Sequence, residues 1–140
     1  MGVLFKNSDI TVYNKYYDPY NDMYKYQRTV IKGVNWQSKR IGTVSDKGLL
    51  LADSTLIFID KLDNYISPKR FAKLESIERE KYFTLTIGDK IVKGEVDFEI
   101  IGIKNYSIND LNNEFDDVIT IKLVNSLSDH FEVEGVWYGG

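Results

Sequence analysis

The chain of 140 residues contains no cysteine and a single histidine, His130. The lack of cysteine excludes disulfides, thiolate metal sites, iron–sulfur clusters and cysteine nucleophiles. A Ser/His/Asp triad would depend on His130 alone, and the sequence has no Gly-x-Ser-x-Gly stretch to supply its nucleophile. We therefore predict no catalytic residues and no enzyme activity.

Motifs for nucleotide and metal binding are also missing from the sequence. Neither Gly-x-Gly-x-x-Gly nor Gly-x-x-x-x-Gly-Lys-Ser/Thr occurs, so no phosphate-binding loop is predicted. The densest group of carboxylates lacks the glycine and the alternating Asp/Asn spacing of a calcium loop, and consists of Asp110, Glu114, Asp116 and Asp117. These absences predict neither a cofactor nor a metal.

Long hydrophobic runs are absent as well. The longest apolar runs, near residues 49–52 and 56–59, are far shorter than a membrane span. The first residues lack a signal-peptide core, and Asn7 stands where an N-myristoylation motif has Ser or Thr. We expect a soluble protein that is made in the cytoplasm and does not enter a membrane.

The composition is that of an ordinary globular domain, with 43% hydrophobic and 28% charged residues. A chain of this length buries about two-thirds of its unfolded surface, enough for a core without disulfides or zinc. No linker, repeat or low-complexity segment divides the sequence. Residues 1–140 are therefore predicted to form a single domain.

Charge is distributed unevenly along the chain. Residues 1–70 carry 11 Lys/Arg against 7 Asp/Glu, whereas residues 71–140 carry 7 against 14, for a total of −3. This uneven distribution of charge either arises by chance or reflects a subunit with one positive and one negative face.

Alternation of apolar and polar residues with a period of two is the main structural signal, and Tyr, Ile, Val, Phe and Thr fill the alternating stretches. Consecutive apolar residues within 54–59 predict a central strand covered on both faces. Gly33 inside a strand predicts a bulge or a bend. About eight strands are expected, at residues 10–16, 24–36, 49–60, 82–87, 90–93, 96–103, 118–124 and 130–137.

One short helix is expected within residues 64–81, where Ser67 would be the N-cap and Pro68 the first helical residue. The Ser107-x-x-Asp110 spacing allows at most two further helical turns. The predicted fold is therefore mainly β, a small antiparallel barrel or sandwich of about eight strands with one short helix.

Tyrosine is concentrated around the first predicted hairpin, where residues 13–26 hold six of the ten tyrosines. Tyr covers half-buried sheets well, and it is also enriched in protein interfaces. Tyrosines on one strand cannot all face the core, so some of them are expected to contact a partner. The predicted subunit or partner interface consists of Tyr16, Tyr17, Tyr20, Tyr24, Trp137 and Tyr138.

Two small basic clusters, Lys39-Arg40 and Lys69-Arg70-x-x-Lys73, interrupt the pattern. In a single copy such clusters are usually solvated surface. In a ring their charge would be multiplied and could line a channel crossed by DNA.

The order of the sequence motifs resembles small proteins encoded in the head–tail connection region of tailed phages and prophages of low-GC Gram-positive bacteria. The resemblance covers nearly the whole chain, and its motifs are strands and turns. The similar segments are residues 10–18 (ITVYNKYYD), 26–36 (YQRTVIKGVNW), 46–49 (DKGL), 52–54 (ADS), 66–71 (ISPKRF), 83–85 (FTL), 88–94 (GDKIVKG) and 117–121 (DVITI).

The resemblance implies a structural protein of the virion, a stopper-like or head-completion β-barrel of the phage neck at the head–tail junction. Such proteins are not enzymes. The expected partners are other copies in a homo-oligomeric ring, with six subunits as the expected number, portal or adaptor proteins above, and a tail terminator or tail tube below. Packaged DNA would be retained by the ring and would pass through its channel without sequence-specific contacts.

Within this resemblance, two segments are candidates for a loop at the channel or the ring axis. The first is the turn of Ser45, Asp46, Lys47 and Gly48, and the second is the excursion from residue 60 to 81 with Lys69, Arg70 and Lys73. The tyrosine-rich hairpin and the C-terminal aromatics would contact neighbours.

Two alternatives remain open. Within the same structural class, the chain could be a tail terminator or another connector ring protein. In a different class, it could be a monomeric β-barrel binding module, such as a carbohydrate-recognising barrel, in which aromatic side chains line a pocket.

Overall fold

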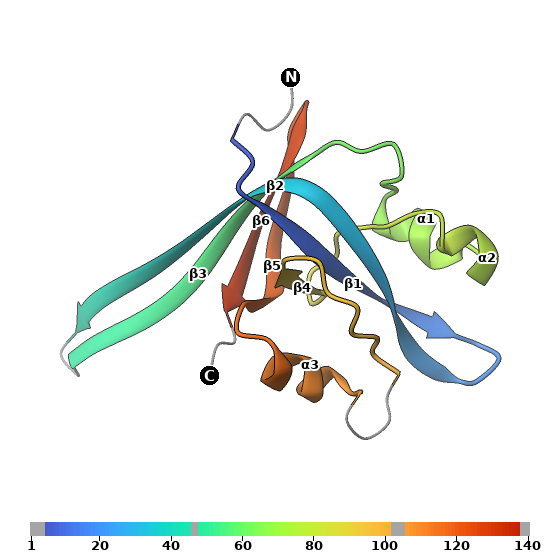
Figure 1. Cartoon of the computed structure of the whole chain (residues 1–140), viewed down its shortest axis with the longest axis horizontal. Helices are drawn as coiled ribbons and strands as arrows, with labels where there is room; N and C mark the ends of the chain where they lie inside the picture. The colour runs from blue at the N-terminus through green and yellow to red at the C-terminus, as the bar shows by residue number, and fades with distance from the viewer. Residues whose placement is uncertain (1–4, 46–47, 102–105, 138–140) are drawn as a thin grey trace.

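The computed structural model describes residues 5–45, 48–101 and 106–137 and is mainly β (Figure 1). Six antiparallel strands close into a barrel in the order β1-β2-β3-β6-β5-β4. The strands are β1 (Ser8–Asp18), β2 (Met23–Ser45), β3 (Gly48–Asp60), β4 (Lys90–Lys93), β5 (Val118–Ser126) and β6 (His130–Trp137). The barrel is thus confirmed, but the described residues form six strands rather than the expected eight.

The barrel interior follows from the alternation in the sequence, because every second residue of a strand points inward. Trp36 of β2 pairs with Ile57 of β3, and both side chains are buried. The core is completed by Ile10, Val12, Ile31, Val34, Ile59, Phe83, Leu85, Ile91, Ile119, Ile121, Phe131 and Val133.

Two stretches expected to be strands, residues 82–87 and 96–103, do not join the barrel in their described parts. Their apolar residues do alternate, and Phe83 and Leu85 enter the core. Their main chains, however, bond to side chains of β1. Asn14 bonds both the N–H and the C=O of Thr84, and Thr11 accepts from the Val96 N–H. Hydrogen bonds to side chains replace the main-chain hydrogen bonds of a strand here. The alternation of apolar residues alone therefore predicted strands that do not form.

The helical excursion contains two short helices rather than one, α1 (Pro68–Lys73) and α2 (Ser76–Arg79). Pro68 begins α1 as expected, but Ser67 makes no capping hydrogen bond with its side chain. The third helix, α3 (Ile108–Glu114), does begin with a capping box, in which Ser107 and Asp110 bond each other's main-chain N–H. Its two turns match the sequence expectation.

Gly33 causes an irregularity in β2, as the sequence predicts. Its φ of 74° lies in the left-handed region, and the register between β1 and β2 shifts between Ser8 and Ile10. The side chain of Asp9 accepts a hydrogen bond from the Gly33 N–H at 2.9 Å. The bulge bends β2 where it passes from β1 to β3, which helps the sheet to close.

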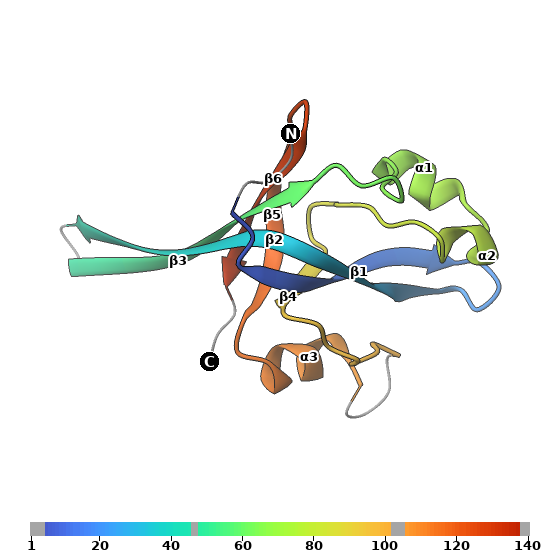
Figure 2. The same cartoon turned by 45° about the horizontal axis from the view of Figure 1, so that its top comes forward.

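A second core covers the outer surface of β1, β4 and β5. Tyr13, Val92 and Val118 are buried there beneath α3 and the segment of residues 96–100. Figure 2 shows α3 below the barrel, on the side opposite to α1 and α2. This side of the barrel is therefore covered by a second apolar layer.

Two other expectations need correction or refinement. Residues 54–59 of β3 alternate between buried and half-buried, so their outer face is only partly covered.

The oppositely charged halves of the chain are joined in space by ion pairs, since Arg28 binds Glu99 at 2.6 Å and Lys32 binds Glu95. These pairs mix the positive and negative segments on this surface.

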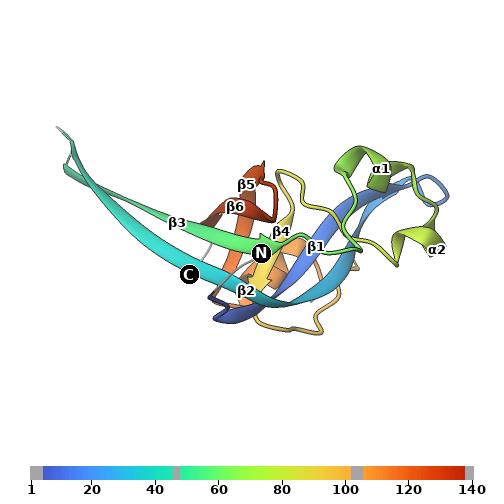
Figure 3. The same ribbon diagram turned by 90° about the horizontal axis from the view of Figure 1, so that it is seen from above.

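The molecule is elongated, and a β-hairpin projects at each end of its long axis (Figures 1 and 3). At one end β1 and β2 continue beyond the barrel to the turn of residues 19–22. At the other end β2 and β3 pair with each other up to Ser45 and Gly48. No helix in the described residues is long and apolar enough to span a membrane.

Candidate functional site

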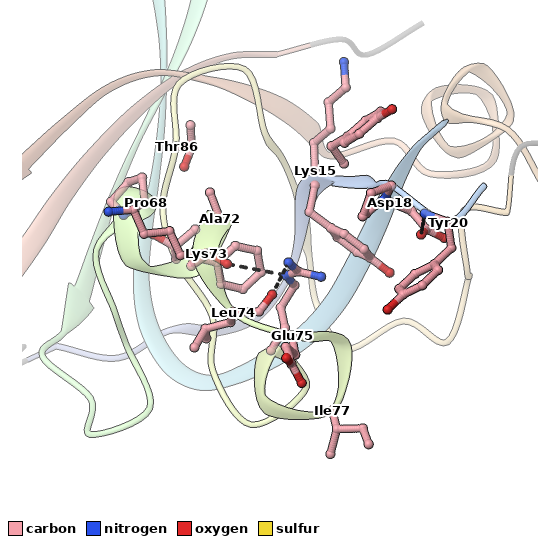
Figure 4. A pocket seen from close by; sticks show the side chains of 16 residues that line it. Lys15, Asp18, Tyr20, Pro68, Ala72, Lys73, Leu74, Glu75, Ile77 and Thr86 are labelled. Atoms are coloured by element: carbon pink, nitrogen blue, oxygen red, sulfur yellow. Dashed lines mark hydrogen bonds between the residues drawn. The ribbon is translucent and has the colours of Figure 1, made fainter. Parts of the chain in front are cut away.

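A groove lies between the β1–β2 hairpin and the α1–α2 segment, with a volume of about 690 Å³ (Figure 4). In Figure 4, Lys15, Asp18 and Tyr20 of the hairpin stand on one side and Lys73 and Leu74 on the other. The walls comprise residues 15–20, Pro68, residues 71–75, Ile77 and Arg79, together with Thr84 and Thr86.

The position of the groove is set by two side-chain amides. Asn14 of β1 and Gln27 of β2 are direct cross-strand partners, so they lie on the same face of the hairpin. The Asn14 amide bonds the main chain of Thr84, and the Gln27 amide donates to the carbonyls of Arg79 and Tyr82 at 2.8 and 2.6 Å. Together they hold the end of the excursion against the hairpin.

Arg79 is a buried cation in the groove wall, with 6% of its surface exposed. Its guanidinium carbon lies 4.3 Å from the centroid of the Tyr16 ring, and Nε and Nη2 donate to the carbonyls of Phe71 and Leu74. Among the described residues no carboxylate pairs with Arg79. The guanidinium closes the C-terminal end of α1 and brings a positive charge to the groove.

The hairpin forms an aromatic rim. Tyr20 is 94% exposed, and the rings of Tyr17 and Tyr24 meet edge to face with centroids 5.4 Å apart. Lys25 lies 2.7 Å from Asp18, and hydrogen bonds from this lysine lower the pKa of Asp18 to about 2. The ion pair therefore persists in mildly acidic solution and helps to fix the turn.

Only some of the site residues predicted from the sequence lie at this groove. Tyr16, Tyr17 and Tyr20 line it together with Lys73, which the sequence assigned to a separate channel loop. Tyr24 packs beside Tyr17, while Lys69 and Arg70 are exposed on α1 and do not line the groove.

The other predicted residues lie away from the groove. Ser45 and Gly48 pair at the tip of the opposite hairpin, and Asp46 and Lys47 between them lie outside the described residues. Trp137 ends β6, but its side chain and the whole of Tyr138 lie outside the described part of the chain.

Sequence reasoning missed three contributors to the groove, namely Phe71 as a wall, Ile77 on the rim and Arg79. Phe71 and Ile77 have the spacing of an apolar stripe on a single helix, but α1 ends at Lys73 and Ile77 is 75% exposed. In the sequence, Arg79 lies in a charged stretch, which is typical of a solvated surface. Only the tertiary contacts with Tyr16 and Phe71 reveal that it is buried.

A buried carboxyl lies behind the groove. Asp89 is 3% exposed and accepts hydrogen bonds from the Asn14 amide at 2.9 Å and from the Lys15 N–H at 3.2 Å. Burial raises the pKa of Asp89 to about 6, since the two hydrogen bonds offset only part of the desolvation cost. The base of the hairpin is therefore sensitive to mildly acidic pH.

Neither a metal centre nor a nucleophile is assembled in the described residues. No group of three or more His, Asp or Glu side chains there is arranged to hold a metal ion. His130 contacts Asp129 at 2.6 Å and Glu132 at 3.5 Å, and the hydrogen bond with Asp129 raises the pKa of the imidazole. No hydroxyl in the described part bonds this ring.

Comparisons with known proteins give one match. No curated protein and no solved structure matches the chain. The model of one protein family, described as a family of unknown function (DUF6751), matches residues 5–136. The match extends from the residues just before β1 to the end of β6, so the chain belongs to this family, DUF6751.

Proposed function

We propose that this protein is a structural subunit of the neck of a tailed phage or prophage. It would form a stopper-like or head-completion ring between the portal or adaptor complex and the tail. The proposal rests first on the resemblance carried by the strand and turn motifs. It predicts a virion protein without catalytic residues, whose ring helps to retain packaged DNA.

The observation that best supports this proposal is the shape of the subunit. A six-stranded barrel carries one projecting hairpin at each end of its long axis (Figure 1). One hairpin is rich in exposed tyrosines, the residue type enriched in interfaces. A subunit with different contact surfaces at opposite ends suits a heterologous, head-to-tail ring.

Within the same class, a tail terminator or another connector ring protein would use the same shape. The position of the chain along the neck axis separates these proteins. A stopper lies on the head side and contacts the portal or adaptor, whereas a terminator caps the tail tube.

The groove also favours a second candidate function, that of a monomeric binding module. Tyr16, Tyr17, Tyr20 and Phe71 line a groove of about 690 Å³, which is large enough for a small ligand such as a short glycan. Size in solution and in the particle separates the two candidates, because a module of this kind would remain a monomer and would not be part of the neck.

Deletion of the gene in the phage or prophage that encodes it tests the proposed function. We expect heads that fail to join tails and that lose packaged DNA, together with free tails, and rescue by the chain supplied from a plasmid. Normal infectious particles without the protein would contradict the proposal.

A further inference from the structure

We propose that the groove beside the tyrosine-rich hairpin binds an extended segment of a partner protein, in which acidic and apolar residues alternate. The segment pairs with the open edge of β1 as an additional strand, and one of its carboxylates binds Arg79. Because a single copy of the chain contains this site, the binding does not depend on the proposed neck function. Two separate features support it, the open edge of β1 and the charge of Arg79.

In the described part of the chain, β1 is paired on only one side where it forms the hairpin. β2 pairs with β1 as far as Asp18, whereas β4 pairs with β1 only from Ile10 to Tyr13. The chain before β4 does not continue along β1, because it turns at Gly88, whose φ of 99° lies in the left-handed region. Residues 14–18 therefore leave an open edge of about 14 Å at the usual rise of a strand.

The free main-chain groups of this edge are identified by Lys15. Its N–H donates to a carboxylate oxygen of Asp89, the residue just before β4, at 3.2 Å, so it points to the side of β4. Main-chain groups along an antiparallel strand point alternately to either side, so the Lys15 carbonyl and both main-chain groups of Tyr17 point to the same side. No described residue bonds these three groups, and an added strand in line with β4 can pair with all of them.

The groove lies along this edge, with residues 15–20 on one side and the α1–α2 segment on the other (Figure 4). Every second side chain of an added strand points to the face of β1 that carries Tyr16, which contacts Arg79. The side chains between them point to the opposite face, where the Tyr17 ring is 45% exposed. Apolar residues suit this second face, because they can pack on the tyrosine.

Arg79 is the reason why the segment should be acidic. Its guanidinium contacts two main-chain carbonyls and the rings of Tyr16 and Phe71, and the side chain is buried. No carboxylate in the described ranges pairs with it, and its Nη1 makes no hydrogen bond there. Buried charges in proteins are usually paired with an opposite charge. A carboxylate on the added strand, on the face of Tyr16, supplies this charge and accepts from Nη1.

The other charges of the groove leave it positive. Lys73 of α1 also lines it. Of the two carboxylates in the described lining, Asp18 is neutralised by Lys25 at 2.7 Å, so only Glu75 opposes Lys73 and Arg79. This excess of positive charge favours an acidic segment over a basic one.

Nuclear magnetic resonance of the isotope-labelled chain tests the proposal with a synthetic peptide. The peptide has about eight residues, the length of an ordinary strand, and glutamate alternates with valine along it. We expect the main-chain amide signals of Lys15, Tyr17 and Arg79 to shift, and the Tyr17 N–H to exchange more slowly with solvent in the complex. Unchanged signals at these residues up to millimolar peptide would overturn the proposal.

Two altered peptides separate the two kinds of contact. Glutamine in place of every glutamate removes the carboxylates and should weaken binding at least tenfold. Methylation of the main-chain nitrogens on one edge of the peptide removes the donors of the added strand and should abolish binding. Undiminished binding of either altered peptide would contradict the proposed contact.

Two proline variants test which edge of the hairpin is used. Tyr17 and Tyr24 are direct cross-strand partners, and their N–H groups point to opposite edges. Tyr17→Pro removes the donor on the β1 edge and should abolish peptide binding. Tyr24→Pro is the matched control on the β2 edge and should bind like the natural chain, since proline is tolerated at open strand edges. Equal binding by both variants would overturn the proposal.

A second pair of variants leaves the strands unchanged. Lys73→Glu reverses an exposed charge in the groove and should weaken binding of the glutamate peptide at least threefold. Lys69→Glu, exposed on the same helix but outside the groove lining, is the control and should not. An equal effect of the two substitutions would show that only the net charge of the protein matters, against a site at Arg79.

Other occupants of the groove give different results in the same experiment. Concentration-dependent shifts of these amide signals in the chain alone would show that a second copy occupies the edge. Shifts caused by a chito-oligosaccharide but not by the peptide would show a glycan site. Either result would overturn the proposal, while the neck function is decided separately by the gene deletion.

Discussion

Asn14 and Gln27 face each other across β1 and β2, and each amide bonds the main chain of residues 79–84. Four hydrogen bonds from two side chains thus connect the excursion to the hairpin. The groove exists because this connection holds α1 and α2 near the tyrosines. The pair is the structural link between the barrel and the candidate site.

Removing either amide should loosen the excursion. We expect Gln27→Ala to lower the free energy of unfolding by about 1–3 kcal/mol, because the carbonyls of Arg79 and Tyr82 lose a partly buried donor. Urea denaturation measures the change, and hydrogen exchange should show reduced protection at residues 79–84. Gln37→Ala, at an exposed position of β2, is the matched control and should change neither.

The raised pKa of Asp89 predicts a pH-dependent stability. Its pKa is about 6 in the folded protein against 3.8 for an ordinary aspartate, so the folded state binds the proton more tightly. The free energy of unfolding should therefore fall as the pH rises from about 4 to 7, by about 2 kcal/mol from this group.

Comparison with Asp89→Asn isolates this contribution. Between pH 4 and pH 7, the free energy of unfolding of the natural chain should fall by this amount relative to that of Asp89→Asn. The exposed Asp97→Asn serves as the control for loss of a carboxylate. A difference that is independent of pH would show that Asp89 is not desolvated.

Gly135 lies where β6 pairs closely with β5, opposite Ile121. A Cβ atom at this position would lie 2.5 Å from Ile119 Cδ1 and 2.9 Å from the main-chain oxygen of Thr120. We expect Gly135→Ala to cost about 1–3 kcal/mol of stability, since the backbone of β5 must move to accept the methyl group. Thermal unfolding measures the cost, and an unchanged melting temperature would contradict the close packing.

The tyrosines should divide into core and interface classes. The Tyr13 hydroxyl is buried and donates to the Phe98 carbonyl at 2.6 Å, so Tyr13→Phe should lower stability by about 1 kcal/mol. Tyr20→Ala should leave stability unchanged, because Tyr20 is 94% exposed, but should weaken self-association. Denaturation and sedimentation equilibrium on both variants separate the effects, and a stability loss in Tyr20→Ala would contradict the assignment.

Local signals predicted much of the fold. The alternation in the barrel strands, the bulge at Gly33 and the capping box at Ser107 depend on neighbouring residues, and the structure follows them. The described parts of the segments at 82–87 and 96–103 were predicted incorrectly because Asn14 and Thr11, distant in sequence, replace a neighbouring strand.

The candidate site was less predictable than the fold. The sequence pointed to the hairpin tyrosines because their number exceeds what one strand face can bury. The burial of Arg79 depends on contacts with Tyr16 and Phe71 that no local pattern encodes. The opposite placement of the Ser45–Gly48 turn and the tyrosines likewise depends on how far β2 extends beyond the barrel at both ends.

Cryo-electron microscopy of whole particles tests the central claim most directly. We predict a ring of this chain at the portal–tail junction, with the elongated barrel recognisable in each subunit. Particles whose neck contains no density for this chain, together with a purified chain that stays monomeric, would contradict the account and favour the binding module.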